Sequence, residues 1–237
     1  MLQKTQEVLE LIANDELFEN NDIRFVGGTA LSYLIEHRLS EDLDFASLEV
    51  SSEEIEEVMK KYGAEKLEHD PTQEDYVTNE GEDINSHYIK FMLKGVKVEF
   101  FAPPFNLFEE EVWREDKYTF YKDTKLKVSS LDTIVYMKTM AFWNRKKYRD
   151  LFDIYYLLEN KYISPNKFIE KYLEYNITYN TEYLHKKIQA PSHFYERSND
   201  EGINSLVSNP KPYEWYRAKI EEFIFSENFC GGIKNGK

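Results

Sequence analysis

The sequence has little cysteine and no long hydrophobic run, and each shortage excludes a class of protein. The single cysteine, Cys230, cannot form a disulfide within the chain, which is typical of a protein kept in a reducing compartment. No uninterrupted apolar run approaches the roughly 18 residues that a membrane-spanning helix needs. Residues 1–18 are charged and amphipathic, unlike the apolar core of a signal peptide. We therefore expect a cytoplasmic protein with no membrane partner.

Basic residues are also scarce. The 30 Lys and Arg residues are outnumbered by 44 Asp and Glu residues, and the formal net charge is −14. This balance argues against a protein that coats nucleic acid by charge alone. Residues 138–149 are a local exception, because they include five basic residues and no acidic one. Since 41% of the 237 residues are hydrophobic and 16% are aromatic, the chain is expected to fold around a proper core.

A glycine pair near the N-terminus separates a predicted strand from a predicted helix. The apolar run from Ile23 to Val26 predicts the strand, Gly27 and Gly28 predict a turn, and the helical pattern begins at Thr29. Glycine lets backbone N–H groups approach a ligand closely, and the N-terminus of a helix attracts a phosphate. The pattern therefore predicts a phosphate-binding turn, with a plain structural turn as the alternative.

Two carboxylates follow on the next predicted strand. Asp42 and Asp44 are two residues apart, so both side chains point to one face of the strand, and Leu43 and Phe45 point to the other. Two carboxylates about 7 Å apart along a strand can hold a hard divalent cation and leave positions for water and phosphate oxygens. We predict a Mg²⁺ (or Mn²⁺) site here, with an ordinary solvated strand face as the alternative.

Together these residues resemble a known family. The order Gly27-Gly28-Thr29-Ala30-Leu31, then Arg38-x-Ser40-x-Asp42-Leu43-Asp44-Phe45, is similar to a motif of the AbiEii-type nucleotidyltransferases. These are a branch of the polymerase-β-like superfamily, and many of them are toxins of toxin–antitoxin pairs. The resemblance implies metal-dependent transfer of a nucleotide from an NTP, with Asp42 and Asp44 on the metal. It assigns the following residues to nucleotide binding: Gly27, Gly28, Thr29, Arg38 and Ser40.

A predicted hairpin holds a further candidate ligand. Residues Ser86–Leu93 and Val96–Phe101 predict two strands joined by a turn at Lys94-Gly95. Members of the superfamily usually carry a third carboxylate on such a neighbouring strand, and Glu99 is the one acidic residue in the second run. Glu99 is therefore either the third metal ligand or an exposed strand residue.

A second stretch resembles the same family. A predicted helix carries Lys138, and the following residues match the family pattern in order: Arg145, Arg149, Asp150 and Asp153. The resemblance assigns Lys138 to the triphosphate, and Arg145, Arg149 and Asp150 to binding or orienting the acceptor. Asp153 would act as a base on the acceptor hydroxyl, or would orient Arg149 or Lys138. The structural alternative is that Lys138 only extends out from a core helix and that Arg149 and Asp153 form an ordinary helix ion pair.

The predicted fold class is α+β. Residues 1–125 are expected to form a nucleotidyltransferase core around a small mixed sheet, and residues 126–237 a helical domain that closes the nucleotide cleft. The predicted reaction joins a nucleotide to an acceptor hydroxyl and releases pyrophosphate. The resemblance implies an RNA acceptor, with tRNA as one candidate, and a cognate antitoxin protein. The alternatives are a metal-dependent nuclease that uses the same carboxylates and a non-catalytic interaction protein on the same fold.

Overall fold

The structure, a computed structural model, divides the chain into two compact units, Met1–Ile134 and Val135–Lys237. It describes residues 1–71, 74, 79, 81–102, 110–144, 147–174, 180–189 and 203–225. The division lies beyond the boundary expected after residue 125, because the strand β7 (Lys127–Val128) pairs in parallel with β1 (Arg24–Val26) and so belongs to the sheet of the first unit.

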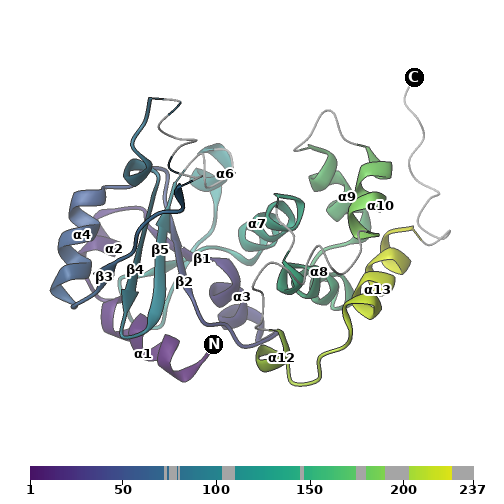
Figure 1. Cartoon of the computed structure of the whole chain (residues 1–237), viewed down its shortest axis with the longest axis horizontal. Helices are drawn as coiled ribbons and strands as arrows, with labels where there is room; N and C mark the ends of the chain where they lie inside the picture. Colours follow the sequence, from purple (N-terminus) through teal and green to yellow (C-terminus); the bar gives the residue numbers. More distant parts are fainter. Residues whose placement is uncertain are drawn as a thin grey trace. The chain divides into compact units, whose positions relative to one another are not determined.

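A mixed sheet forms the centre of the first unit (Figure 1). Within the described residues it has seven strands in the order β3-β4-β5-β2-β1-β7-β6. The remaining strands are β2 (Leu43–Ala46), β3 (Glu65–Lys66), β4 (Tyr88–Leu93), β5 (Val96–Phe101) and β6 (Thr119–Phe120). Strand β2 is central, since it runs antiparallel to β1 and parallel to β5. The predicted mixed sheet and the hairpin of β4 and β5 are confirmed.

Helices of the first unit cover the sheet and connect its strands. They are α1 (Gln3–Ile12), α2 (Glu16–Asn20), α3 (Gly27–Ile35), α4 (Ser52–Lys61), the short 3₁₀ helix η1 (Ile84–Ser86) and α6 (Glu110–Glu115). Phe18 of α2 packs on Phe45 of β2 with ring centroids 5.2 Å apart, and Phe45 stacks on Phe100 of β5 at 5.0 Å. The apolar core of this unit therefore lies on the Phe45 face of the sheet, on the side of α2 in Figure 1.

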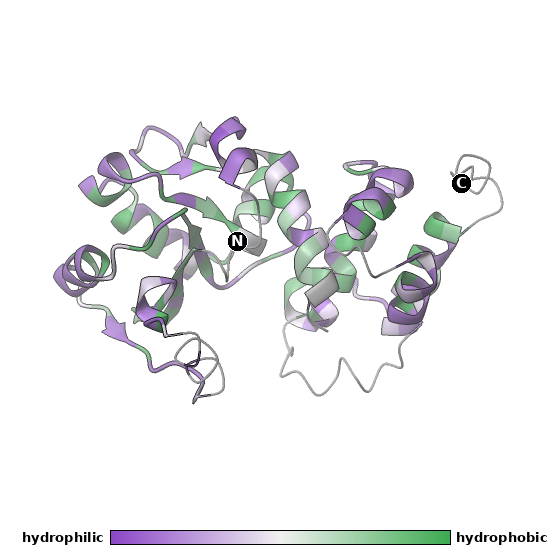
Figure 2. Cartoon of the chain, turned by 90° about the horizontal axis from the view of Figure 1, so that it is seen from above, coloured by the Kyte–Doolittle hydropathy of each residue, from purple (hydrophilic) through white to green (hydrophobic). Residues whose placement is uncertain are grey.

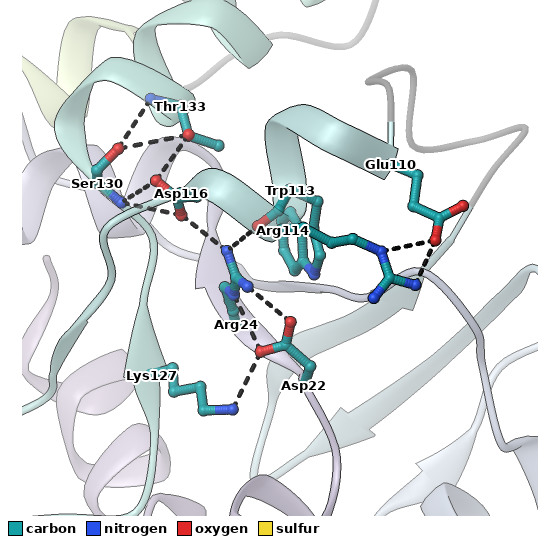
Figure 3. Close-up of polar contacts among 9 residues, drawn as sticks. All are labelled: Asp22, Arg24, Glu110, Trp113, Arg114, Asp116, Lys127, Ser130 and Thr133. Atoms are coloured by element: carbon teal, nitrogen blue, oxygen red, sulfur yellow. Dashed lines mark hydrogen bonds and ion pairs between the residues drawn. The ribbon is translucent and has the colours of Figure 1, made fainter.

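A buried ion pair and the hydrogen bonds around it connect β1 to the start of α7 (Leu131–Asn144), as Figure 3 shows. Arg24 is 3% exposed, and its Nη1 donates to Asp116 Oδ2 at 3.0 Å and to the carbonyl oxygen of Trp113 at 2.8 Å. The Asp116 carboxylate also accepts hydrogen bonds from the backbone N–H of Ser130 at 3.2 Å and from the hydroxyl of Thr133 at 2.8 Å. A carboxylate at this end of a helix is favoured by the helix dipole. The network therefore stabilises the first turn of α7.

The second unit is helical, as predicted. Its further helices are α8 (Tyr148–Glu159), α9 (Pro165–Glu174), α10 (Thr181–Ile188), α12 (Ile203–Leu206) and α13 (Tyr213–Phe225). Aromatic rings join α8 to α13, with centroid distances of 5.4 Å between Phe152 and Tyr216 and 5.2 Å between Tyr155 and Trp215. Single helices carry both hydrophobic and hydrophilic residues (Figure 2), which is typical of amphipathic packing. No helix in the described ranges has both the length and the apolar character to cross a membrane.

Candidate active site

The glycine pair forms the first turn of α3, which begins at Gly27 directly after β1 and not at Thr29 as expected from the sequence. This first turn requires a glycine at its first position. The backbone angle φ of Gly27 is +74°, in the left-handed region that favours glycine. A Cβ atom at Gly27 would lie 2.0 Å from Asp44 Oδ2 and 2.7 Å from Asp44 Cβ, so a side chain has no room there. Gly28 is buried in the first turn of α3. The carboxylate of Asp44 thus lies directly against the start of this helix.

Hydroxyl groups attach the segment before β2 to α3. Thr29 Oγ1 lies 2.8 Å from Ser40 Oγ and hydrogen-bonds to the carbonyl oxygen of Asp42. The Ser32 hydroxyl donates to the carbonyl oxygen of Arg38 at 2.5 Å. The side chains of Thr29, Arg38 and Ser40 are buried. These three residues of the first motif therefore hold the Asp42 segment in place through contacts inside the protein, and their predicted role in nucleotide binding stays a prediction.

Three carboxylates share the face of the sheet opposite Phe45. Leu43 and Phe45 are fully buried, whereas Asp42 and Asp44 are partly exposed, which is the alternation expected from the sequence. Asp44 is the register partner of Glu99 on the parallel strand β5, so the two side chains point to the same face from neighbouring strands. The sheet therefore brings together the three carboxylates proposed from the sequence, although the role of Glu99 as a ligand stays a prediction.

Two residues that the sequence did not single out contact these carboxylates. Lys97 Nζ lies 2.6 Å from Glu99 Oε2 and 3.7 Å from Asp42 Oδ2. The phenol of Tyr88, on β4, donates a hydrogen bond to Glu99 Oε1. Burial lowers the pKa of Lys97, but the carboxylates of Glu99, Asp42 and Asp44 raise that pKa by more, so the ammonium stays charged. Burial and the contact with Glu99 raise the pKa of Tyr88 far above its ordinary value, so the phenol stays a donor. The only available sequence signal was the i, i+2 spacing of Lys97 and Glu99.

The donor set of this face suits a hard divalent cation. Asp42, Asp44 and Glu99 offer carboxylate oxygens, which are the ligands that Mg²⁺ and Mn²⁺ prefer. In the part of the chain that the structure describes, no group of three or more His, Cys, Asp or Glu side chains is arranged to hold a metal ion. Mg²⁺ commonly binds through only one or two carboxylates, with waters and substrate phosphates as its other ligands. The pair Asp42 and Asp44, beside a turn that suits a phosphate, fits that mode.

In the second unit Lys138 is buried against two carboxylates of α8. Its Nζ lies 2.8 Å from Asp153 Oδ2 and 3.6 Å from Asp150 Oδ1, and the three side chains are 6%, 0% and 1% exposed, respectively. Full burial of Asp153 against Lys138 favours the alternative in which Asp153 orients this lysine. Arg149 lies in the same helix, α8, whereas Arg145 falls outside the described residues.

The sequence matches one family over most of its length. Residues 11–224 match the family described as the nucleotidyl transferase AbiEii toxin of type IV toxin–antitoxin systems. The chain belongs to this family. The resemblance carried by the two motifs is thereby confirmed, and the protein is placed among nucleotidyltransferase toxins.

Solved structures agree with the AbiEii assignment at the level of the fold. A protein assigned as a nucleotidyltransferase from H. pylori has a TM-score of 0.54 at 15% sequence identity, and the match covers 94% of each chain. The nucleotidyltransferase toxin MenT4 from Mycobacterium tuberculosis has a TM-score of 0.51 at 17% identity, over 85% of this chain and 74% of that chain. No curated protein sequence matches.

Proposed function

We propose that this AbiEii-family protein is a metal-dependent transferase that moves a nucleotide from an NTP to an acceptor hydroxyl. We also propose that it acts as a toxin neutralised by a cognate antitoxin protein. The observation that supports the reaction best is the contact between the Asp44 carboxylate and Gly27 at the start of α3. A carboxylate suited to a metal and a turn suited to a phosphate thus occupy one place in the first unit.

The turn offers hydrogen-bond donors to the triphosphate. The residue before the helix, Val26, makes no side-chain hydrogen bond to the first N–H groups of α3. Such N–H groups and the positive end of the helix dipole suit a phosphate. Gly27 and Gly28 would bring the backbone close to the phosphate oxygens. Thr29 would contribute through its backbone, because its hydroxyl is used by the carbonyl of Asp42.

Asp42 and Asp44, with Glu99 beside them, are the residues that would hold Mg²⁺ or Mn²⁺. A divalent cation bound there would neutralise phosphate charge and stabilise the charge that develops on the attacking and leaving oxygens. In the proposed reaction the acceptor oxygen forms a bond to the α-phosphorus while the bond between the α-phosphorus and the bridging oxygen breaks. Pyrophosphate leaves with the bonding electron pair, and the hydroxyl proton passes to solvent.

Residues of the second unit are proposed to act on the triphosphate and the acceptor. Lys138 would add positive charge to the triphosphate, with Asp150 and Asp153 fixing the position of its ammonium. Arg145 and Arg149 would contact an RNA acceptor, with tRNA as one candidate. This part of the proposal is supported by the family motif and by the basic segment 138–149.

Incubation of the purified protein with cellular RNA, Mg²⁺ and each labelled NTP tests the proposal. A transferase labels and lengthens RNA and releases pyrophosphate, and EDTA stops both. Asp44→Asn should lower the rate by about a hundredfold or more, because the metal supplies several kcal/mol and each ~1.4 kcal/mol is tenfold in rate. Asp123→Asn makes the same change at an exposed position away from the cluster and should leave the rate unchanged. Transfer at the wild-type rate by folded Asp44→Asn would refute the metal site, and RNA shortening without NTP would indicate a nuclease.

A further inference from the structure

A lysine side chain reaches into the carboxylate cluster of the first unit. Lys97 and Glu99 are two residues apart on β5, and the register that pairs Leu43 with Val98 continues to bring Lys97 beside Asp42. The ammonium lies 2.6 Å from one oxygen of Glu99 and 3.7 Å from one oxygen of Asp42. It therefore contacts a carboxylate on each of two neighbouring chain segments, and it is itself about one-third exposed.

The charges on this face explain why the lysine matters for a metal ion. Asp42, Asp44 and Glu99 carry three negative charges, and Lys97 neutralises one of them through direct contact. A divalent cation on the same face would use the carboxylate oxygens that Lys97 now contacts. Two cations that share the same carboxylates repel one another at close range. The bound triphosphate would bring several negative charges of its own, which offset this repulsion.

We propose that Lys97 is a built-in counter-ion that competes with the divalent cation for Asp42 and Glu99. The protein without nucleotide then binds the cation weakly, and tight binding requires cation and triphosphate together. Lys97 in this scheme is a positioning residue that couples the two ligands. The inference rests on the proposed function, since it takes a metal site at Asp42 and Asp44 as given.

Titration with Mn²⁺, followed by electron paramagnetic resonance, tests this coupling directly. The titration is carried out on the full chain, with and without a non-hydrolysable NTP analogue. Lys97→Met should bind Mn²⁺ at least about tenfold more tightly than the wild type without nucleotide, because one positive charge beside the site is removed. The factor by which the analogue tightens Mn²⁺ binding should fall accordingly. Lys97→Gln, which retains a hydrogen-bond donor toward Glu99, should show the same gain and serves if Lys97→Met does not fold.

Two control variants separate contact from net charge. Lys97→Arg keeps the positive charge at the cluster and should retain the wild-type Mn²⁺ affinity. Lys66→Met removes the same charge from the edge strand β3, where Lys66 pairs with Glu56 at 2.5 Å, and should also match the wild type. If folded Lys97→Met and Lys97→Gln bind Mn²⁺ no more tightly than the wild type, the inference is overturned. The proposed function still stands in that case, provided that the wild-type protein binds Mn²⁺ in the presence of the NTP analogue. Absence of Mn²⁺ binding in every variant, with or without the analogue, would overturn both.

Discussion

Replacing Gly27 by alanine tests the close contact between the proposed phosphate-binding turn and the carboxylate of Asp44. Two costs add. A non-glycine residue at φ +74° pays about 1–2 kcal/mol for the left-handed conformation. The new Cβ would also lie 2.7 Å from Asp44 Cβ, against ordinary contacts of 3.4–4 Å. Rotation of the Asp44 side chain cannot relieve a clash with its own Cβ, so strand β2 must shift, and overpacking of this kind costs about 1–3 kcal/mol. The expected loss of stability is therefore about 2–5 kcal/mol.

Gly63→Ala is the matched control for this substitution. Gly63 has φ +79° at the end of α4, but a Cβ there would meet nothing within 4 Å. Gly63→Ala should therefore lower the free energy of unfolding only by the conformational cost of about 1–2 kcal/mol. Urea denaturation of the two variants and the wild type measures the difference. Pyrophosphate release should fall in Gly27→Ala, because Asp44 is displaced, and should persist in Gly63→Ala.

The double variant Gly27→Ala/Asp44→Ala isolates the contact itself. The Asp44 carboxylate is the nearest group to the added Cβ, so its removal should restore part of the lost stability. In a double-mutant cycle with Gly27→Ala and Asp44→Ala as the single variants, the coupling energy should be about 0.5–3 kcal/mol. If Gly27→Ala is no less stable than Gly63→Ala and transfers nucleotide normally, then Asp44 does not lie against Gly27 and the reasoning about the turn is wrong.

Three further substitutions address other buried charges. Lys138→Ala removes a buried cation that contacts two buried carboxylates of α8 and should cost about 3–5 kcal/mol in urea denaturation; Lys138→Arg should retain much of that stability. Asp116→Ala removes one of the two carboxylates that pair with buried Arg24, while Asp22 still pairs with it, and it also removes the acceptor at the start of α7; denaturation should show a loss of about 1.5–3 kcal/mol. Burial raises the pKa of Asp15, but hydrogen bonds, led by that from Lys61, lower it by more, so the pKa lies below its ordinary value of 3.8. Because the folded-state pKa is the lower one, the Asp15 carboxylate stabilises the fold above pH 3.8, and this stabilisation is lost as the pH falls through the folded-state pKa. Asp15→Asn should therefore lower stability at neutral pH and flatten its acid dependence, as measured by denaturation between about pH 2 and 7.

The sequence alone was sufficient for features that depend on local periodicity. Alternation along one strand places Asp42 and Asp44 on the face opposite Phe45, and the structure confirms this arrangement. The order of glycine pair, helix and carboxylates, together with the later pattern of Lys138, Arg145, Arg149, Asp150 and Asp153, was specific enough to identify the family to which residues 11–224 match. Side-chain direction along a strand and the position of a turn are set by neighbours in sequence, so a single chain displays them directly.

Tertiary structure decided which groups meet. The register between β2 and β5 brings Glu99 beside Asp44, and the same register gives Lys97 its contact with Asp42. Arg24 finds Asp116 across 92 residues of sequence. A register between strands, or a pairing between distant charges, depends on how whole elements pack, because shifting a strand by one residue turns every side chain to the other face. Local pattern therefore determined the candidate carboxylates and the turn, whereas the partners that tune them follow from long-range packing.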